Sequence, residues 1–309
     1  MVNKPGSDEK FSVLKIYGPT IVLLALIFGL TIWSFATGLA AKEGTPPLTP
    51  VTITLLIVVG LVAGVLGGII GTGGCSVMLP ILHFYLGYPA PIAIGTTLFA
   101  VIFTAISGGY GHLIRKNLDV KTTLWLAGFG IIGVVLGSNI FTLLTDKTAL
   151  LGLLLGIAFL LPAIRMIIEG VSHRKKAQPE GNVIPGSELG KGSFGFVVGI
   201  LTGLVGLGGG YALVPGLIYL FGAPVYVTMG TSLATMIPLA IVGGGIKLVQ
   251  GFVAIGAGLI LAMGTIVGAQ FGAAIIKKFH PATLKLIFGL YFLYVSVKFI
   301  LANFGIKIF

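Results

Sequence analysis

The apolar residues of the chain fall into uninterrupted runs of about twenty residues, separated by short polar segments that carry most of the lysines and arginines. A run of this length matches a helix that crosses the roughly 30 Å hydrocarbon core of a bilayer. A transmembrane β-barrel would instead show alternating segments of about ten residues. The pattern therefore predicts an all-α polytopic membrane protein, because helices satisfy their own backbone hydrogen bonds in lipid.

Most of these runs are long enough to be complete spans, and we expect spans at 17–39, 91–112, 121–144, 148–169, 225–249, 252–276 and 282–303. The other apolar residues form two interrupted pairs, 51–70 with 76–86 and 193–205 with 211–221. The second piece of each pair is too short to cross the hydrocarbon alone. We expect each pair to be a re-entrant helix, broken inside the membrane, that enters and leaves on one side.

Each interruption is a cluster of glycines, and the two clusters lie 135 residues apart. The first is Gly71-Thr72-Gly73-Gly74-Cys75-Ser76, and the second is Gly206-Leu207-Gly208-Gly209-Gly210-Tyr211. The same offset relates Pro80 to Pro215 and Gly95-Thr96-Thr97 to Gly230-Thr231-Ser232. This agreement without a gap predicts an internal repeat, 51–169 and 193–309, joined by a cytoplasmic linker at 170–192. Residues 1–50, an extra helix and a polar link, have no counterpart.

The distribution of positive charge sets the expected orientation. Lys4, Lys10 and Lys15 place the N-terminus in the cytoplasm, and the clusters Arg115-Lys116, Arg174-Lys175-Lys176 and Lys277-Lys278 follow the positive-inside rule. Three spans then separate the broken pairs. Because this number is odd, the two repeats have opposite topology, and their breaks meet near the midplane, where transporters with inverted repeats bind their substrate.

Composition narrows the class of protein. Only 9% of residues are charged and 56% are hydrophobic, whereas a soluble domain has about 25% charged residues. The net charge of +11 resides in loops and does not indicate nucleic acid, and the single cysteine excludes an intrachain disulfide. We expect a multi-pass protein of the cell (inner) membrane. The first run is longer than the apolar region of a signal peptide, so a retained helix is favoured over a cleaved one.

The breaks are the expected substrate-binding site. Backbone groups freed inside a membrane persist only where protein, water or ligand satisfies them, and the start of a helix offers N–H groups and a positive dipole end to an anion. The candidates in the breaks are Gly71, Thr72, Gly73, Gly74, Cys75, Ser76, Gly206, Gly208, Gly209, Gly210 and Tyr211. The polar candidates outside the breaks are Thr96, Thr97, Thr231, Ser232, His112 and Lys247.

Structural alternatives stand beside these assignments. The hydroxyls could cap helices, and His112 and Lys247 could lie at the interface. Glycines such as Gly60, Gly64 and Gly68 have the small-xxx-small spacing of helix packing. Cys75 could fill space rather than contact a ligand. His83 is expected to be a packed histidine, and Arg165 and Glu169, four residues apart, a solvated pair.

The sequence holds no metal cluster, catalytic triad or cofactor motif, and the glycines follow no strand, so a dinucleotide site is not indicated. We expect no enzyme activity, no cofactor and no metal. Three functions remain open: a secondary anion transporter, an anion channel, and a membrane enzyme or sulfur-relay protein centred on Cys75. The transporter is favoured. The oligomeric state is left open, and the first helix could serve a homodimer.

The doubled motif resembles the sulfite exporter TauE/SafE family over residues 55–300. Each break, Gly71-x-Gly73-Gly74 and Gly206-x-Gly208-Gly209, is followed by a proline and a Gly-Thr pair, and His112 precedes Arg115-Lys116-Asn117-Leu118-Asp119. The resemblance implies movement of a small sulfur-containing anion, such as sulfite or an organosulfonate like sulfoacetate, by export. Import of sulfate or thiosulfate is the alternative. Cys75 departs from the pattern, since the family and the second break (Gly210) favour glycine.

Overall fold

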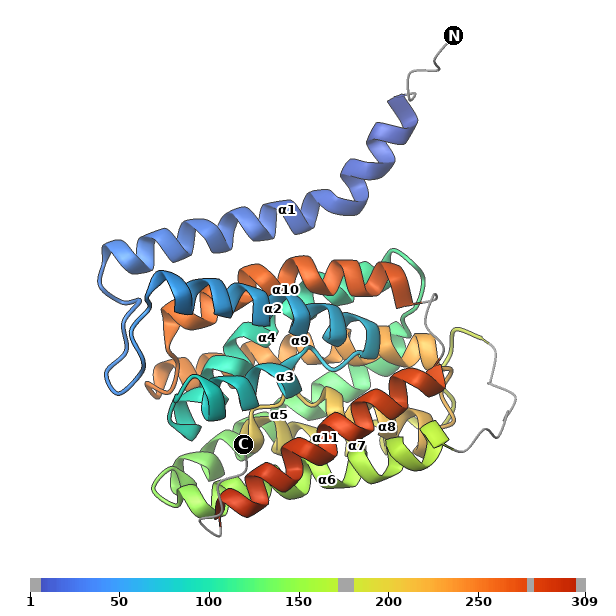
Figure 1. Ribbon diagram of the computed structural model, residues 1–309. Helices are drawn as coiled ribbons and strands as arrows, with labels where there is room; N and C mark the ends of the chain where they lie inside the picture. The colour runs from blue at the N-terminus through green and yellow to red at the C-terminus, as the bar shows by residue number, and fades with distance from the viewer. Residues whose placement is uncertain (1–6, 172–180, 277–280, 304–309) are drawn as a thin grey trace.

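The computed structural model describes residues 7–171, 181–276 and 281–303 (Figure 1). These residues form helices without any strand. The first half contains α1 (Ser7–Ala36), α2 (Pro50–Ile70), α3 (Cys75–Pro80), the π-helix η1 (Ile81–Tyr85), α4 (Ala90–Leu113), α5 (Val120–Leu144) and α6 (Thr148–Val171). The second contains α7 (Glu188–Val205), α8 (Gly210–Leu220), α9 (Val225–Val249), α10 (Ile255–Ile275) and α11 (Pro281–Asn303).

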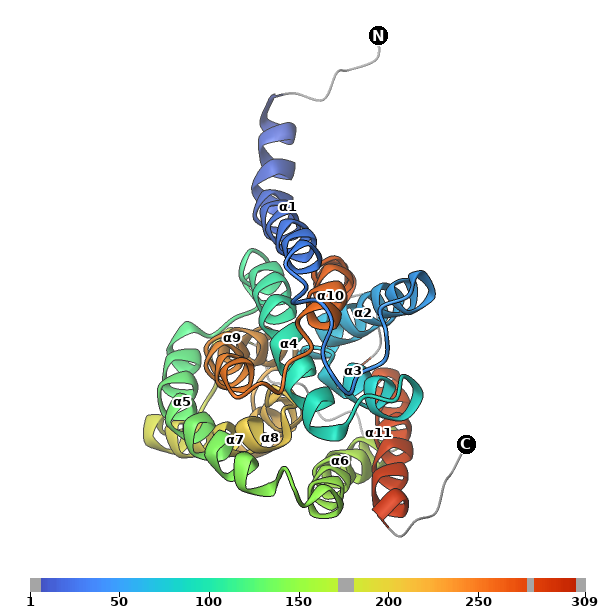
Figure 2. The ribbon, with the colours of Figure 1, turned by 90° about the vertical axis from the view of Figure 1, so that its left-hand side faces the viewer.

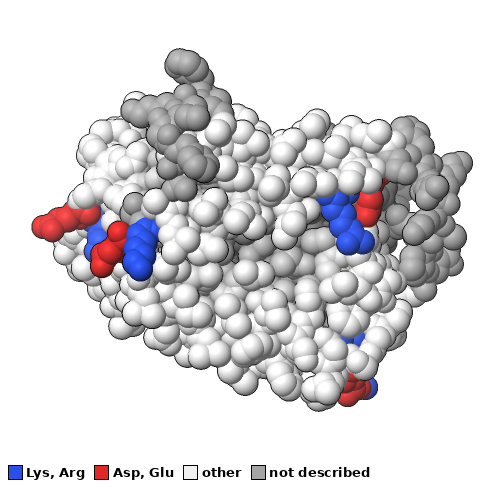
Figure 3. Space-filling model, turned by 90° about the horizontal axis from the view of Figure 1, so that it is seen from below, with Lys and Arg blue, Asp and Glu red and all other residues white. Residues whose placement is uncertain are grey.

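Eight helices of the described ranges are long and apolar enough to cross a membrane. Charged side chains gather towards the two ends of the face shown in Figure 3, and the band between them is almost uncharged. This distribution suits a bilayer, in which ionisable side chains are costly at the centre. The predicted all-α, polytopic fold is therefore confirmed.

The helices pack in pairs that connect the two halves of the sequence. In Figure 2, α4 and α9 lie in the middle of the bundle, with α2 and α10 on one side and α5 and α7 on another. The last helices of the halves, α6 and α11, pack against each other, and α1 lies along the outside on α10. Neither half therefore packs as a separate unit.

Glycines bring two of these pairs into backbone contact. A Cβ added to Gly64 would lie 2.5 Å from the carbonyl oxygen of Thr265, and one added to Gly199 would meet the carbonyl of Gly130. Gly60 and Gly68 meet Leu261 and Ala269 in the same way, and Gly195 and Gly203 meet Leu126 and Val134. Each of these three contacts between α2 and α10 thus has a counterpart 135 residues away between α7 and α5. The expected packing role of Gly60, Gly64 and Gly68 is confirmed, because only small residues permit such close approach.

Some helix boundaries differ from those expected. Helix α7 begins at Glu188 rather than 193, because the side chain of Ser187 accepts a hydrogen bond from the Gly190 amide and caps the helix. Residues 188–192 are therefore helical rather than part of the linker. The short piece after the first break is also not one α-helix, since it changes to a π-helix after Pro80. Lys4, Arg174-Lys175-Lys176 and Lys277-Lys278, used for the orientation, lie outside the described residues.

Candidate substrate-binding site

Both glycine clusters turn the chain through left-handed backbone conformations at equivalent positions. Gly71, Gly73 and Gly74 have φ of 80°, 70° and 74°. Gly206, Gly208 and Gly209 have φ of 70°, 66° and 81°. Residues with a Cβ rarely adopt these angles, so glycine is required here for the turn itself. The turn folds the chain back beside the preceding helix, and a Cβ on Gly74 would lie 2.7 Å from the carbonyl carbon of Ala63.

The two breaks meet around one pair of side chains in the middle of the bundle. A Cβ on Gly73 would lie 2.5 Å from Met236 Cε and 3.3 Å from Val101 Cγ1. A Cβ on Gly208 would lie 2.5 Å and 3.0 Å from the same two atoms. Val101 and Met236 are themselves 135 residues apart, on the central helices α4 and α9. The structure therefore brings together the two segments that the sequence singled out.

Cys75 connects one break to the other. Its fully buried Sγ contacts the carbonyl oxygens of Leu207 and, at 3.2 Å, Thr72. At the equivalent position, Gly210, an added Cβ would lie 2.5 Å from the Cα of Thr72. The space that the Cys75 side chain occupies in one break is thus filled by backbone in the other. This asymmetry explains why only the first break carries a cysteine, and the thiol fits the space-filling alternative.

Three of the four candidate hydroxyls outside the breaks bond to the backbone. Thr96 Oγ1 accepts a 2.9 Å hydrogen bond from the Ala254 amide, and Thr231 Oγ1 accepts one of 3.0 Å from the Asp119 amide. These bonds are again related by the offset of 135, and each holds the residue just before α10 or α5. Ser232 donates to the carbonyl of Gly71 at 2.8 Å. Thr96 and Thr231 therefore hold the residues that precede α10 and α5, and they do not cap the helices to which they belong.

Near the breaks, other buried hydroxyls have no hydrogen-bond partner within the described ranges. They are Thr97 Oγ1, Tyr211 Oη and Thr235 Oγ1. Thr97 and Tyr211 were sequence candidates, whereas Thr235 was missed because its counterpart in the first half is Ala100. Burying a hydroxyl without a partner costs about 1–3 kcal/mol. Polar atoms left in this state beside the breaks are suited to contact a ligand.

His112 and Lys247 lie away from the point where the breaks meet. They follow Val101 and Met236 by eleven residues along α4 and α9, which is about 16 Å along a helix axis. His112 Nε2 lies 2.9 Å from the carbonyl oxygen of Gly68. Lys247 Nζ lies 3.1 Å from the centroid of the Phe141 ring and has no hydrogen-bond partner in the described part of the chain. Both side chains are buried, so neither reaches the interface.

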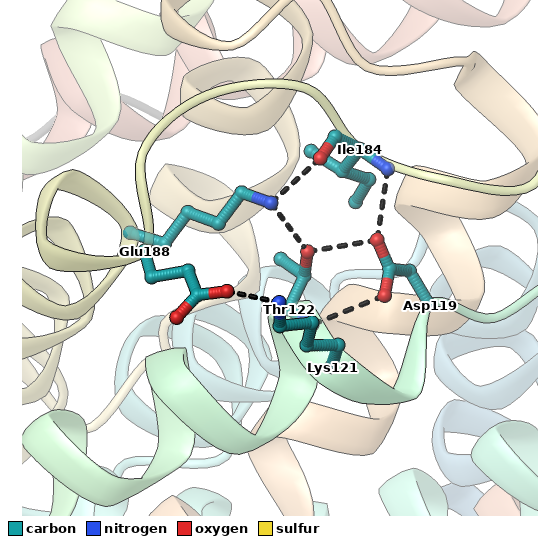
Figure 4. Close-up of polar contacts among 6 residues, drawn as sticks. Asp119, Lys121, Thr122, Ile184 and Glu188 are labelled. Atoms are coloured by element: carbon teal, nitrogen blue, oxygen red, sulfur yellow. Dashed lines mark hydrogen bonds and ion pairs between the residues drawn. The ribbon is translucent and has the colours of Figure 1, made fainter.

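A polar cluster holds the start of α7 against the start of α5 (Figure 4). We call Asp119, Thr122, Ile184 and Lys191 the Asp119 cluster. The Asp119 carboxylate accepts hydrogen bonds from the Ile184 amide at 2.8 Å and from the amide and hydroxyl of Thr122. Lys191 Nζ donates to Thr122 Oγ1 at 2.9 Å and to the Ile184 carbonyl at 2.6 Å. Lys121 and Glu188 form an exposed ion pair beside it.

The Asp119 cluster keeps its carboxylate ionised. Burial alone would raise the pKa of Asp119, but the hydrogen bonds from Ile184 and Thr122 and the positive charge of Lys191 together lower the pKa below its usual value. Sequence reasoning placed Asp119 just before the expected span 121–144. It gave no role to Lys191, whose partners are distant in sequence. The offset of 135 pairs Asp119 with Ala254 and Lys191 with Leu56, so the other end of the bundle has no equivalent cluster.

The described bundle, with eight helices long and apolar enough to cross a membrane and two glycine breaks that meet inside it, defines a multi-pass membrane protein. The family "Sulfite exporter TauE/SafE" matches residues 55–299, and the chain belongs to this family. The match begins after α1, as the resemblance in the sequence indicated.

Similar proteins carry the same description. The chain is 28% identical to the probable membrane transporter protein YdhB of Bacillus subtilis over 75% of this chain and 93% of the relative. It is 27% identical to YunE of the same organism, over 81% and 98%. It is 30% identical to MJ0441 of Methanocaldococcus jannaschii, over 76% and 90%. Both are also described as probable membrane transporter proteins. No solved structure matches the chain.

Proposed function

We propose that the protein is a secondary transporter that exports a small sulfur-containing anion, such as sulfite or an organosulfonate like sulfoacetate. The observation that carries this proposal is the meeting of the two breaks beside the unpartnered hydroxyls of Thr97, Tyr211 and Thr235. A small oxyanion needs several hydrogen-bond donors in place of its water. Hydroxyls and the amides at the start of α8 supply donors without a fixed counter-charge, which suits release as well as binding.

The two halves, 51–169 and 193–309, act as inverted repeats in this proposal, each with a re-entrant helix pair. Three spans, α4, α5 and α6, lie between the broken pairs, so the second pair enters from the face opposite to the first. The reciprocal contacts of α2 with α10 and of α7 with α5 support this arrangement. With the N-terminus in the cytoplasm, α3 approaches the centre from outside and α8 from the cytoplasm.

In this proposal, the site between the two breaks opens to one side of the membrane at a time. Val101 and Met236 fill the space between Gly73 and Gly208, so an anion enters only when α4 and α9 shift relative to one another. Opening also breaks the bonds from Ser232 to Gly71 and from Cys75 to Leu207. A packed centre of this kind fits a transporter better than a channel, which needs a continuous water-filled path.

Transport by purified protein in proteoliposomes tests the proposal. We expect saturable flux of labelled sulfite or sulfoacetate, and we expect Thr97→Val with Tyr211→Phe to reduce the flux strongly while thermal unfolding stays near wild type. Gly245→Ala is the matched control, because Gly245 on α9 has nothing within 4 Å of an added Cβ. Equal flux in the double variant and the control contradicts the site. Unitary currents across planar bilayers would indicate a channel, and uptake of sulfate or thiosulfate alone would indicate an importer.

A further inference from the structure

A groove of about 360 Å³ lies on the surface between α11 and the short helices that follow the first break. Most of its wall is apolar, formed by Val77, Pro80, Ile81, Phe84 and Val295. Its volume is in the range of small-molecule sites. We place the open side of the groove against lipid, because α11 is a predicted span and its residues Gly289–Ala302 form an apolar helix.

One end of the groove is polar and carries a positive charge. Tyr85 and Tyr294 hydroxyls lie 2.8 Å apart, and Lys298 Nζ donates to Tyr294 Oη at 3.4 Å. Lys298 Nζ also lies 4.2 Å from the centroid of the Tyr85 ring. Tyr85 is 59% exposed. Neither of the ion pairs in the described residues involves Lys298, and the neighbours of its ammonium group there are aromatic rings and the Tyr294 hydroxyl.

At the corresponding place in the second half, an arginine lies over the equivalent aromatic ring. Tyr219 on α8 is the counterpart of Phe84, and Arg165 on α6 lies 3.6 Å from its ring centroid. There the cation has an acidic neighbour, since Arg165 pairs with Glu169 at 3.6 Å and Tyr219 donates to the same carboxylate. This confirms the expected Arg165–Glu169 pair. Of these two places, only the groove beside Lys298 combines an apolar wall with a cation that has no acidic partner among the described residues.

The inner end of the groove reaches the first break. Tyr291, on the groove wall, donates a 3.2 Å hydrogen bond to the carbonyl of Ser76, the residue after Cys75. Val77 and Pro80 belong to the same short helix. An occupant of the groove would therefore lie against the element that forms half of the candidate site.

We propose that this groove binds an anionic phospholipid, with an acyl chain along the apolar wall and the phosphate at Lys298 and the two tyrosine hydroxyls. Lysine near a membrane surface attracts anionic lipids, and tyrosine favours the same interfacial depth. A small sulfonate or sulfite ion fits poorly, because the apolar wall would remove its water without replacing the hydrogen bonds. The chain-and-headgroup chemistry of a phospholipid matches both parts of the groove. This site is separate from the proposed transport site.

Lipid binding to the full-length protein in detergent tests this inference. We expect dioleoyl phosphatidylglycerol to raise the unfolding temperature more than dioleoyl phosphatidylcholine does. Lys298→Met should weaken the apparent affinity for phosphatidylglycerol about five-fold, the factor expected for one interfacial lysine. Lys147→Met is the control, because Lys147 is an exposed lysine beside an apolar helix and does not line the groove, and it should behave as wild type. Tyr85→Phe should have a smaller effect in the same direction.

Several results would overturn the inference. Equal stabilisation by the two lipids, or an unchanged phosphatidylglycerol affinity in Lys298→Met, would remove the headgroup site. If inorganic phosphate or sulfoacetate stabilises the protein and Lys298→Met abolishes this effect, Lys298 binds a free anion rather than a lipid headgroup. Native mass spectrometry with the same lipids gives a second measurement that does not depend on folding stability. None of these outcomes alters the proposed transport site, whose test is anion flux.

Discussion

The hydroxyl of Ser232, near the start of α9, donates a 2.8 Å hydrogen bond to the carbonyl oxygen of Gly71 at the end of α2. Thr97 occupies the equivalent place on α4, and its hydroxyl is buried without a partner in the described part of the chain. A side chain from the opposite half thus holds the first break. The second break lacks this bond, so equivalent substitutions in the two halves should have different effects.

Ser232→Ala should lower the free energy of unfolding by about 1 kcal/mol, because it removes the bond and leaves the Gly71 carbonyl without that donor. Thr97→Val should be neutral or slightly stabilising, since it replaces an unpartnered hydroxyl with a methyl group of the same shape. Thermal unfolding in detergent measures both. Equal losses in the two variants would contradict the asymmetry between the breaks.

Gly133→Ala should destabilise the protein by about 1–3 kcal/mol through overpacking. Its added Cβ would lie 2.8 Å from the Ile200 amide nitrogen and even closer to the Phe196 carbonyl of α7. The control lies on the same helix, because an added Cβ at Gly128 has nothing within 4 Å. Gly128→Ala should be neutral or stabilising, since alanine is the better helix former by about 1 kcal/mol. If both alanine variants unfold at one temperature, α5 and α7 are not in the contact described.

Alanine substitutions at the equivalent positions Cys75 and Gly210 should also have unequal effects. Gly210→Ala places a Cβ 2.5 Å from the Thr72 Cα, which is backbone and cannot move aside easily. We expect this variant to unfold at a lower temperature and to transport poorly. Cys75→Ala removes only a sulfur atom and should retain activity. A loss of transport in Cys75→Ala, with normal stability, would restore the hypothesis that the thiol takes part in the function.

Lys247→Met tests whether the buried Lys247 side chain contributes to anion transport. The Lys247 amine is fully buried over the Phe141 ring without a hydrogen-bond partner in the described part of the chain, and burying a polar group in this way carries a stability cost that methionine would remove. We expect equal or higher thermal stability together with slower flux, because methionine can neither hold a proton nor donate a hydrogen bond to an anion that passes along α9. Lys147→Met serves as the matched control. Unchanged flux would give Lys247 a structural role only.

The Asp119 cluster should make stability depend on pH. A carboxyl whose pKa is lower in the folded than in the unfolded state stabilises the fold above its ordinary pKa, and this contribution is lost as the pH falls through the folded value. The ordinary value for Asp119 is 3.8. Asp119→Asn should therefore unfold more easily than wild type at neutral pH, by about 1.5–3 kcal/mol for charged hydrogen bonds. The two proteins should converge as the pH is lowered below 3.8, which melting curves at several pH values can check.

Much of the architecture could be predicted because glycines recur at equivalent positions in the two halves of the sequence. Positions such as Gly71 and Gly206 require a backbone conformation that only glycine adopts easily, so the breaks were visible as residues. The same reasoning identified Gly64 as a packing position. The family, too, was recognisable from the two motifs and their spacing.

The side-chain network could not be predicted in the same way. Thr96 and Thr231 bond to amides that lie far away in sequence, and no local pattern distinguishes such an acceptor from a ligand contact. Lys191 was unremarked because its partner Thr122 precedes it by 69 residues. Thr235 breaks the repeat, so the offset gave no signal for it. Boundaries such as the start of α7 depended on one capping serine.

The pairing of α2 with α10 has a consequence for how the protein is made. The glycine face of α2, which contains Gly64, fits against a helix that ends at Ile275. At roughly 5–20 residues per second, the ribosome needs on the order of 10–40 s to finish that partner after α2 emerges. During this interval the glycine face of the nascent α2 has no helix to pack against. Insertion machinery or neighbouring lipid must shield it, and delayed synthesis of the second half would expose the newborn chain to proteolysis.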